Sequence, residues 1–540
     1  MPRTGAEQRA QGPLVWVLLV VSAGLAWAAW AVSSPAGSSP DDDFHLASIW
    51  CADGPSAGAA RGDVCTPADG PPTSGAINRV VPNDVLVVGQ HGPDCFRFMS
   101  QVSAVCVRLV PPGTTVHVTN AGLYPQGFYK VTHQFVSSSV TTTVMWIRGL
   151  NIVLALVVFG LAFLVSGRRT RAALALTLGL AMCTPIGLFF IPSTNPTAWS
   201  TIGIGSLWVF VVAYMDADVA WRRWTAAGGG FLAWLIAVMA RADAPVYAAL
   251  TVLAAAAIGT ERGRLITTKL IMPGALVALS IGAFFAGSGG SVASKGVAPT
   301  AAGATQGAPD FILQQIAYNT AHPLHLLLSN IPGLWEYERK LFYTGPLGWG
   351  DTPMSEQGFI IPVVLLVIMV TAILRYRGWH RTAYVCLFLA ALVIPLAVLQ
   401  QSHLSVHSGY VQPRYLYPLM LGLLGLGLSA HIGSGRFDRI ARNRWVLVLT
   451  WAVISGFASL ALHIELRRYV SGIDVSDLNL DSHREWWWVD WPLSPMGVWV
   501  IGTVAMAVSV GLLLRIALVN ARSVEPVLDA YDHSRESSAA

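Results

Sequence analysis

The sequence predicts an all-α membrane protein that crosses the bilayer many times, and three observations lead to this fold class. Of its 540 residues, 54% are hydrophobic and only 12% are charged, whereas charged residues make up about a quarter of a soluble domain. The mean hydropathy is +0.55. The hydrophobic residues gather in runs of about 20, the length of one membrane-spanning helix, which gives about twelve spans. These values exclude soluble, fibrous and disordered proteins.

The first apolar run, residues 13–32, is too long for the hydrophobic region of a signal peptide, and no convincing small-residue cleavage site follows it. We therefore expect a retained first transmembrane helix after a cytoplasmic N-terminus of residues 1–12. Arg3 and Arg9 then lie on the cytoplasmic side. An extracytoplasmic loop domain, residues 33–147, follows.

The remaining runs predict eleven further spans. Residues 148–286 supply transmembrane helices 2–7, residues 358–462 supply helices 8–11, and residues 497–514 form the last helix before a cytoplasmic tail at 515–540. The individual runs lie at roughly 150–166, 172–191, 201–215, 225–240, 244–259, 267–286, 358–374, 382–399, 413–430, 445–462 and 497–514.

Two more outer loops separate these groups. The loop at 287–357 begins with a Gly/Ala/Ser/Thr-rich stretch that is flexible by composition, and its continuation is expected to be partly helical. The loop at 463–496 contains Trp486, Trp487, Trp488 and Trp491. An aromatic belt at the bilayer interface is favoured over stacking on sugar rings for these side chains.

Arginines determine the predicted orientation. The net charge of +5 arises from arginines in short loops between the apolar runs, which is a topology signal and no sign of a nucleic-acid partner. With a cytoplasmic N-terminus, alternate loops carry these arginines inside, and both termini are cytoplasmic. The arginines in question are Arg168, Arg169, Arg171, Arg222, Arg223, Arg262, Arg264, Arg375, Arg377, Arg381, Arg436, Arg439, Arg442 and Arg444.

The cysteines agree with this orientation. Cys51, Cys65, Cys95 and Cys106 all lie in the first outer loop, on the oxidising face. We expect two disulfides, most simply Cys51 with Cys65 and Cys95 with Cys106, although four cysteines allow three pairings. A zinc site is disfavoured because the spacings are not of the CxxC type.

Three consecutive carboxylates, Asp41, Asp42 and Asp43, follow the first predicted span. Their mutual repulsion suits a general base or a cation site. If a helix starts near Pro40, Asp41 and His45 are four residues apart and share a face. The alternative is an acidic N-cap and first turn, which the helix dipole favours.

The acidic stretch is the first of six short sequence blocks that are spaced along the chain. The six blocks are Pro40-Asp41-Asp42 with His45; Tyr124-Pro125 with Phe128-Tyr129, followed by Arg148; Asn195-Pro196; Arg241-Ala242-Asp243; Leu347-Gly348-Trp349-Gly350-Asp351-Thr352; and Gln412-Pro413-Arg414-Tyr415-Leu416. In this order they resemble the bacterial domain-of-unknown-function family 2142 within the GT-C glycosyltransferase superfamily. Asp43 stands where the family has a proline, and Pro413 where it has a glycine.

The resemblance implies a GT-C-like fold and a transferase that takes a sugar from a polyprenyl-phosphate donor at the extracytoplasmic face. Asp41 or Asp42 would deprotonate an acceptor hydroxyl as it attacks the anomeric carbon, with inversion. Arg414 would bind the donor phosphate, because an arginine at the interface holds a phosphate bidentately. Further donor-phosphate contacts would come from Gln412, Tyr415, His403 and His407. The substrate cavity would include His45, Tyr124, Arg148, Asn195, Arg241, Asp243, Trp349 and Asp351.

The partners implied are a polyprenyl-phosphate-linked sugar, a cell-envelope glycan or lipid acceptor, and the lipid bilayer of a bacterial plasma membrane. Whether a divalent cation binds at the acidic stretch is left open, because some GT-C enzymes use one and others do not. The Ala/Gly/Arg-rich, lysine-poor composition is typical of a high-GC bacterium, such as an actinobacterium. Sugar, acceptor and protein partners are undetermined.

Two other functions stay open. A lipid or polysaccharide transporter or flippase would use similar spans, but the near absence of charge within them counts against coupled transport. A noncatalytic envelope-assembly scaffold would retain the fold of an enzyme ancestor. The departures from the family blocks at Asp43 and Pro413 are compatible with this alternative. There is no P-loop, Rossmann fingerprint or HExxH motif.

Overall fold

The structure is a computed structural model, which describes residues 12–59, 62–69, 75–87, 95–260, 267–287, 310–339, 346–354, 360–408, 412–434, 439–440 and 442–522. Four predictions concern residues outside these ranges. They are the flexible start of the loop at 287–357, the cytoplasmic side of Arg3 and Arg9, the arginines Arg262, Arg264 and Arg436, and the end of the C-terminal tail.

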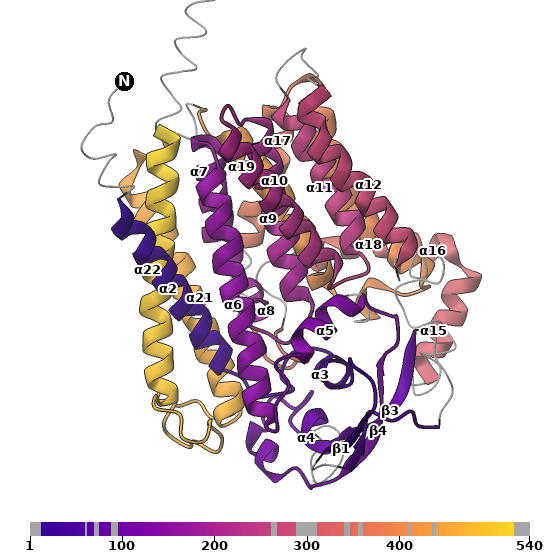
Figure 1. Ribbon diagram of the computed structural model, residues 1–540. Helices are drawn as coiled ribbons and strands as arrows, with labels where there is room; N and C mark the ends of the chain where they lie inside the picture. Colours follow the sequence, from indigo (N-terminus) through magenta and orange to yellow (C-terminus); the bar gives the residue numbers. More distant parts are fainter. Residues whose placement is uncertain are drawn as a thin grey trace, which may run out of the picture.

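The described residues form a bundle of long helices with a smaller domain at one end (Figure 1). By length and composition, seven of these helices could each cross a membrane. They are α2 (Pro13–Val32), α6 (Val140–Val165), α9 (Thr197–Met215), α12 (Ile271–Ala286) with the preceding turn η3 (Thr267–Leu270), α18 (Gly378–Gln401), α21 (Arg444–Val470) and α22 (Pro495–Arg522).

Shorter helices complete the bundle, and each predicted apolar run falls on a helix. These elements are α7 (Arg168–Thr177), the π-helical turn η2 (Leu178–Met182), α8 (Pro185–Phe190), α10 (Ala220–Val238), α11 (Ala244–Gly259), α17 (Ile360–Arg375) and α19 (Tyr417–His431). The predicted run at 172–191 is broken before Pro185, because proline supplies no N–H for the helical hydrogen bond.

The second long helix, α6, begins earlier than the sequence predicts. Its first residue is Val140, where Ser139 caps the helix by accepting a hydrogen bond from the Thr142 N–H. Hydropathy misses this turn because three threonines lower its apolar content. Arg148 therefore lies inside the helix instead of at its entrance, and the loop domain ends at residue 139, not 147. The last helix, α22, likewise extends to Arg522.

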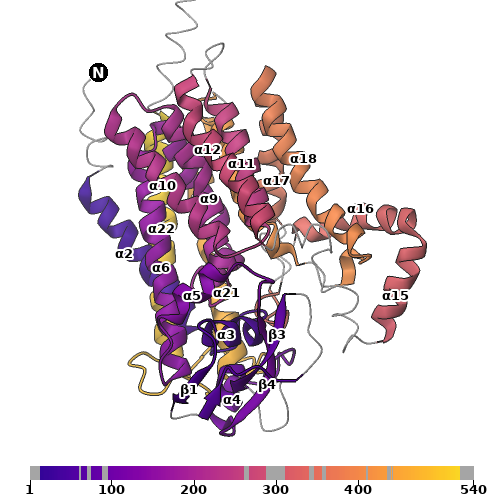
Figure 2. The ribbon, with the colours of Figure 1, turned by 45° about the vertical axis from the view of Figure 1, so that its right-hand side comes forward.

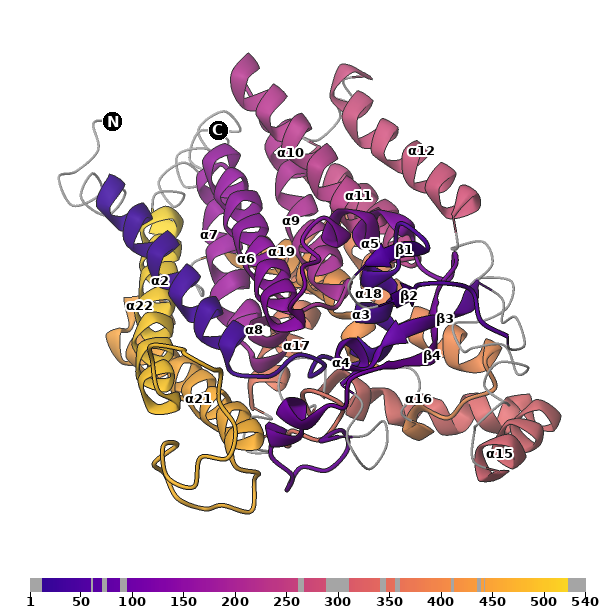
Figure 3. The same cartoon turned by 60° about the horizontal axis from the view of Figure 1, so that its bottom comes forward.

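Helix α9 occupies the centre of the bundle, since 94% of its most apolar stretch is buried. It packs against α10, α11, α19 and α6. A helix that is apolar on every side, as α9 is, needs neighbours all around it. Helices α2, α21 and α22 lie together at one edge of the bundle, where α22 also packs against α7 (Figures 1 and 3).

The loop domain is not purely helical. It contains α3 (Asp42–Trp50), α4 (Asn83–Leu86), η1 (Ala104–Leu109) and α5 (Gln126–His133), with two antiparallel ribbons. One ribbon pairs β1 (Ser56–Ala59) with β2 (Gly62–Val64), and the other pairs β3 (Ala76–Pro82) with β4 (Thr114–Asn120), seen from below in Figure 3. The all-α prediction holds for the bundle and misses these ribbons.

Two disulfides tie the loop domain together, and their pairing is the one predicted. Cys51, at the end of α3, bonds Cys65 with the Cα atoms 5.2 Å apart. Cys95 bonds Cys106 in η1 with the Cα atoms 5.8 Å apart. Each bond closes a short loop, so each restricts the unfolded chain.

The loop at 287–357 is partly helical, as expected. Helices α15 (Asp310–Ala321) and α16 (Pro323–Arg339) project from the bundle beside α18 (Figure 2).

Three of the four tryptophans in the last loop lie inside the protein and not at its surface. Trp486, Trp487 and Trp488 are buried, and the Trp488 Nε1–H donates to the Val32 carbonyl at the end of α2. The predicted belt is therefore wrong for these three side chains, because the loop folds back against the bundle.

Candidate functional site

The acidic stretch lies where the chain leaves α2 and starts α3. Asp41 is the N-cap residue of α3 and has a left-handed backbone, with φ of 60°. The His45 N–H donates to the Asp41 carbonyl at 2.8 Å, as in a first helical turn. The helix predicted to start near Pro40 begins at Asp42, two residues later, with Asp41 as its N-cap and Asp42 and Asp43 in its first turn. This is the acidic N-cap and first turn that the sequence offered as the alternative.

Asp41 and Asp42 have different surroundings. Asp42 is fully buried, where its carboxylate accepts hydrogen bonds from the Ser39 N–H at 3.0 Å and the Thr194 hydroxyl at 2.5 Å. Burial raises the pKa of Asp42 to about 6, although these two hydrogen bonds oppose the shift. The Asp41 side chain is 46% exposed. Of the two predicted bases, only Asp41 is directly accessible from outside.

Arg414 contacts Asp41 directly, although 373 residues separate them in sequence. The Arg414 Nη2 lies 2.8 Å from Asp41 Oδ2. Arg414 belongs to η7 (Pro413–Tyr415), just before α19, and its guanidinium lies over the rings of Tyr415 at 5.0 Å and Phe190 at 5.9 Å. These rings hold the cation in place beside the carboxylate.

A second arginine joins this cluster from the turn between α10 and α11. Arg241 makes a two-pronged contact with Asp243, with Nε to Oδ1 at 2.9 Å and Nη2 to Oδ2 at 2.7 Å. Its Nη1 donates to the Thr197 hydroxyl at 3.3 Å. The guanidinium lies 4.6 Å above the Tyr415 ring. Tyr415 is therefore the platform that Arg241 and Arg414 share.

Aromatic side chains from α3, from α5 and from the turn before α5 form the other wall. His45 Nδ1 lies 2.9 Å from the Tyr129 hydroxyl, and the Tyr124 ring meets the His45 ring edge-on at 5.3 Å. Burial lowers the pKa of His45 to about 3, so this histidine is neutral at pH 7. Burial likewise raises the pKa of Tyr124 and Tyr129. This wall offers neutral rings and hydroxyls.

Two buried side chains hold the segment that carries Asp41. The Asn195 amide donates to the Pro40 carbonyl at 2.8 Å. Arg148 donates to the carbonyls of Ala31, Ser34 and Pro35. Both residues were predicted to line the substrate cavity, and in the structure both hydrogen-bond the backbone that precedes Asp41.

Trp349 and Asp351 make other contacts. The Trp349 Nε1–H donates to the Gly37 carbonyl at 2.8 Å. Asp351 pairs with Arg468 of α21 at 2.7 Å and accepts a hydrogen bond from the Phe98 N–H at 3.1 Å. These two residues connect the loop at 346–354 to the loop domain and to α21. Neither belongs to the Asp41 and Arg414 cluster.

The predicted histidines lie against α15 and α16. The His403 carbonyl accepts a hydrogen bond from Asn319 of α15 at 2.8 Å. His407 Nε2 lies next to Gly333 of α16. Gln412 is the N-cap of η7, where its carbonyl accepts from the Tyr415 N–H at 3.1 Å. Gln412 therefore shapes the turn that presents Arg414.

Sequence reasoning missed several residues of this site. Thr194 hydrogen-bonds Asp42, Thr197 hydrogen-bonds Arg241, and Phe190 lies beside Arg414. The signal available was their position on either side of the Asn195-Pro196 block. Outside this site, Arg468 and the fully buried Glu465 of α21, which lie near Asp351, were also missed. Charged residues near the end of an apolar run resemble ordinary interface residues.

This arrangement joins one accessible carboxylate to two arginines and a wall of neutral aromatic rings. A carboxylate in this position can accept a proton, and arginines bind phosphate well. Within the described ranges, no group of three or more His, Cys, Asp or Glu side chains is placed to hold a metal ion.

Comparison with known proteins finds one family. The family described as "Predicted membrane protein (DUF2142)" matches residues 25–423, well over half of the chain. The match includes every block from Pro40 to Leu416. No curated protein and no solved structure matches the chain.

Proposed function

Because the chain belongs to the DUF2142 family of predicted membrane proteins, we propose that it is a glycosyltransferase of the GT-C type. It transfers a sugar from a polyprenyl-phosphate donor to a cell-envelope glycan or lipid acceptor. The observation that carries this proposal is the contact of Asp41 with Arg414 beside Arg241. A carboxylate base and cations for a phosphate are the two groups that such a transfer needs.

In the proposed reaction, Asp41 accepts the proton of the acceptor hydroxyl. The acceptor oxygen then attacks the anomeric carbon from the face opposite the phosphate, so configuration inverts. The bond from the anomeric carbon to the phosphate oxygen breaks, and polyprenyl phosphate leaves with the electron pair. Arg414 and Arg241 stabilise the charge that develops on that oxygen. Asp42 accepts hydrogen bonds from the Ser39 N–H and the Thr194 hydroxyl and takes no proton from the acceptor.

We further propose which end of the bundle faces the cytoplasm. Arginine-bearing connections contact one another at the end of the bundle away from the loop domain. Arg222 donates to the Val165 carbonyl, and Arg169 donates to the Ser429 carbonyl. By the positive-inside rule this end is cytoplasmic, as are both termini. The disulfide-containing loop domain and Asp41 are then extracytoplasmic, at the plasma membrane of a bacterium, and the bundle crosses it about twelve times.

The experiment that tests this function uses membranes from cells that overproduce the full chain. They are incubated with a panel of radiolabelled polyprenyl-phosphate sugars and native envelope acceptors. We expect transfer with the wild type and a loss of about 10²- to 10⁴-fold in Asp41→Asn, the range typical of a general base. Asp53→Asn is the matched control, since Asp53 is an exposed acid of the same loop domain, 3.4 Å from His133.

Full activity in Asp41→Asn would contradict the assignment of the base. Absence of transfer from every donor, with the wild type folded, would contradict the enzyme class. The next measurements would then be lipid movement across vesicles, for a flippase, and partner capture, for an assembly scaffold.

A further inference from the structure

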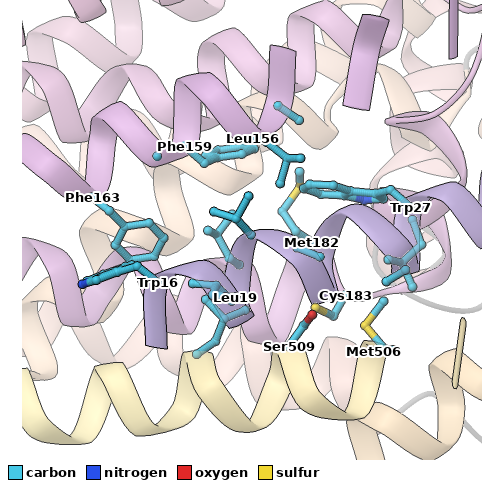
Figure 4. Close-up of a pocket in the computed structure, with 18 of the residues that line it drawn as sticks. Trp16, Leu19, Trp27, Leu156, Phe159, Phe163, Met182, Cys183, Met506 and Ser509 are labelled. Carbon is cyan, nitrogen blue, oxygen red and sulfur yellow. The ribbon is translucent and has the colours of Figure 1, made fainter. Parts of the chain in front are cut away.

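A groove of about 430 Å³ lies between α2, α6 and α22, away from the Asp41 cluster. Figure 4 shows its lining, with Trp16, Leu19 and Trp27 from α2, Phe159 from α6, and Met506 from α22. Arg171 is charged and Ser509 carries a hydroxyl group. The other lining side chains are uncharged and mostly hydrocarbon or aromatic. All three helices are among those that could cross a membrane.

The groove opens on the side of the bundle. Val20 of α2 and Leu164 of α6 line it and remain 46% and 57% exposed. In a membrane this surface faces lipid, so the molecules that can enter are the lipids themselves. An apolar cavity of this size stays dry, and its walls lose contacts unless a hydrocarbon fills it.

The length of the groove matches one leaflet. Its lining on α2 runs from Trp16 to Trp27, which at 1.5 Å per residue is about 16 Å. The hydrocarbon core of a bilayer is about 30 Å thick, so one leaflet contributes about 15 Å. One extended acyl chain therefore spans the groove from end to end.

One end of the groove is basic. Arg171 lines it and donates to the Phe163 and Ser166 carbonyls, and the Phe163 ring contacts the Trp16 ring with centroids 5.3 Å apart. Helix α7 starts three residues before Arg171, so the positive end of its dipole points to the same place. Arg168 is exposed at the start of α7. A phosphate beside the acyl chain is attracted by all of these charges.

The sugar donor is not the occupant that this geometry favours. The basic end lies at Trp16, near the start of α2, whereas Asp41 follows the opposite end of the same helix. A phosphate at Arg171 is therefore about one bilayer leaflet or more from Asp41 and Arg414. We propose that the groove binds one acyl chain of an anionic membrane phospholipid, whose phosphate lies at Arg171. This proposal does not depend on the proposed transferase activity.

The test compares two glycines that each have open space at the Cβ position. Gly160 lines the groove on α6, and Gly228 is exposed on α10 and does not line it. The full chain is purified in mild detergent, and phosphatidylglycerol or phosphatidylcholine is added before native mass spectrometry. We expect one retained phosphatidylglycerol in the wild type and in Gly228→Phe. We expect at least about a tenfold loss of occupancy in Gly160→Phe, because the new ring occupies the groove.

Two further variants keep the test decisive. Ala23→Leu narrows the groove from the α2 side with a side chain smaller than phenylalanine, and it should also lower the occupancy by phosphatidylglycerol. This variant serves as the test if Gly160→Phe does not fold. Arg171→Gln should keep the acyl chain and reduce the preference for phosphatidylglycerol over phosphatidylcholine. Equal retention of phosphatidylglycerol in Gly160→Phe, Ala23→Leu and Gly228→Phe would overturn the proposal. The proposal would also be overturned if the wild-type protein retained polyprenyl phosphate in this groove in place of phospholipid.

Discussion

At the scale of single residues, the neighbouring acids Asp41 and Asp42 differ in burial. Asp42 is buried and its pKa is raised from 3.8 to about 6. A carboxyl whose pKa is higher in the folded than in the unfolded chain stabilises the fold most when it is protonated. Its contribution is complete below about pH 4, is lost as the pH rises to about 6, and then stays constant.

Asp42→Asn tests this linkage because asparagine does not titrate. We expect the stability of the wild type to fall relative to Asp42→Asn between pH 4 and 6, and the difference to be constant from pH 7 upward. The measurement is the thermal unfolding of both proteins in detergent, followed by tryptophan fluorescence over this pH range. Parallel curves for the two proteins would show that Asp42 ionises as a solvated carboxyl does.

At the scale of elements, α6 determines where the chain goes after α2. Arg148 holds the segment from Ala31 to Ser38 by donating to three carbonyls and to the Ser38 hydroxyl, at 3.2 Å. A lysine keeps the charge but lacks the planar fork that reaches several acceptors at once. We expect Arg148→Lys to lower transfer activity by about 10- to 100-fold, since a small displacement of a catalytic group costs about that much.

The control for this prediction is Arg79→Lys, because Arg79 of β3 donates to the Cys65 carbonyl, away from Asp41. It should retain wild-type activity. The assay is the same radiolabelled transfer, run at several donor concentrations. Unchanged activity in Arg148→Lys would mean that the path from α2 to α3 does not depend on this arginine.

At the scale of the whole molecule, a buried ion pair connects three distant parts of the chain. Arg468 of α21 pairs with Asp351 and donates to the carbonyls of Phe96 and Val102 in the loop domain. The side chains of Arg468 and Asp351 are 0% and 3% exposed. Removing one partner of such a pair leaves the other charge buried and unpaired, which typically costs about 3–5 kcal/mol.

We therefore expect Asp351→Ala to lower the free energy of unfolding by about 3–5 kcal/mol. Asp53→Ala breaks the exposed contact with His133 and should cost less than about 1 kcal/mol. Both are measured by denaturant or thermal unfolding of the purified protein in detergent. Equal stability of the two variants would show that the Arg468 and Asp351 pair does not hold the loops to the bundle.

The sequence alone determined the membrane class and the approximate positions of the helices, and it favoured the disulfide pairing that the structure has. Each of these depends on local properties. Hydropathy sums the transfer free energy of neighbouring residues, and the paired cysteines are only 14 and 11 residues apart. The missed first turn of α6 shows the limit, since its threonines are polar by composition and its cap is a hydrogen bond that hydropathy does not count.

Only the tertiary structure decided which predicted site residues meet. Asp41 and Arg414 are 373 residues apart, and their contact depends on how α2, α9 and α19 pack. The same packing buries Asp42 and leaves Asp41 accessible, directs His403 toward α15, and folds Trp488 against α2. Residue types along the chain specify which side chains could pair. Which pairs form depends on the packing of distant helices, and local sequence patterns carry no record of that packing.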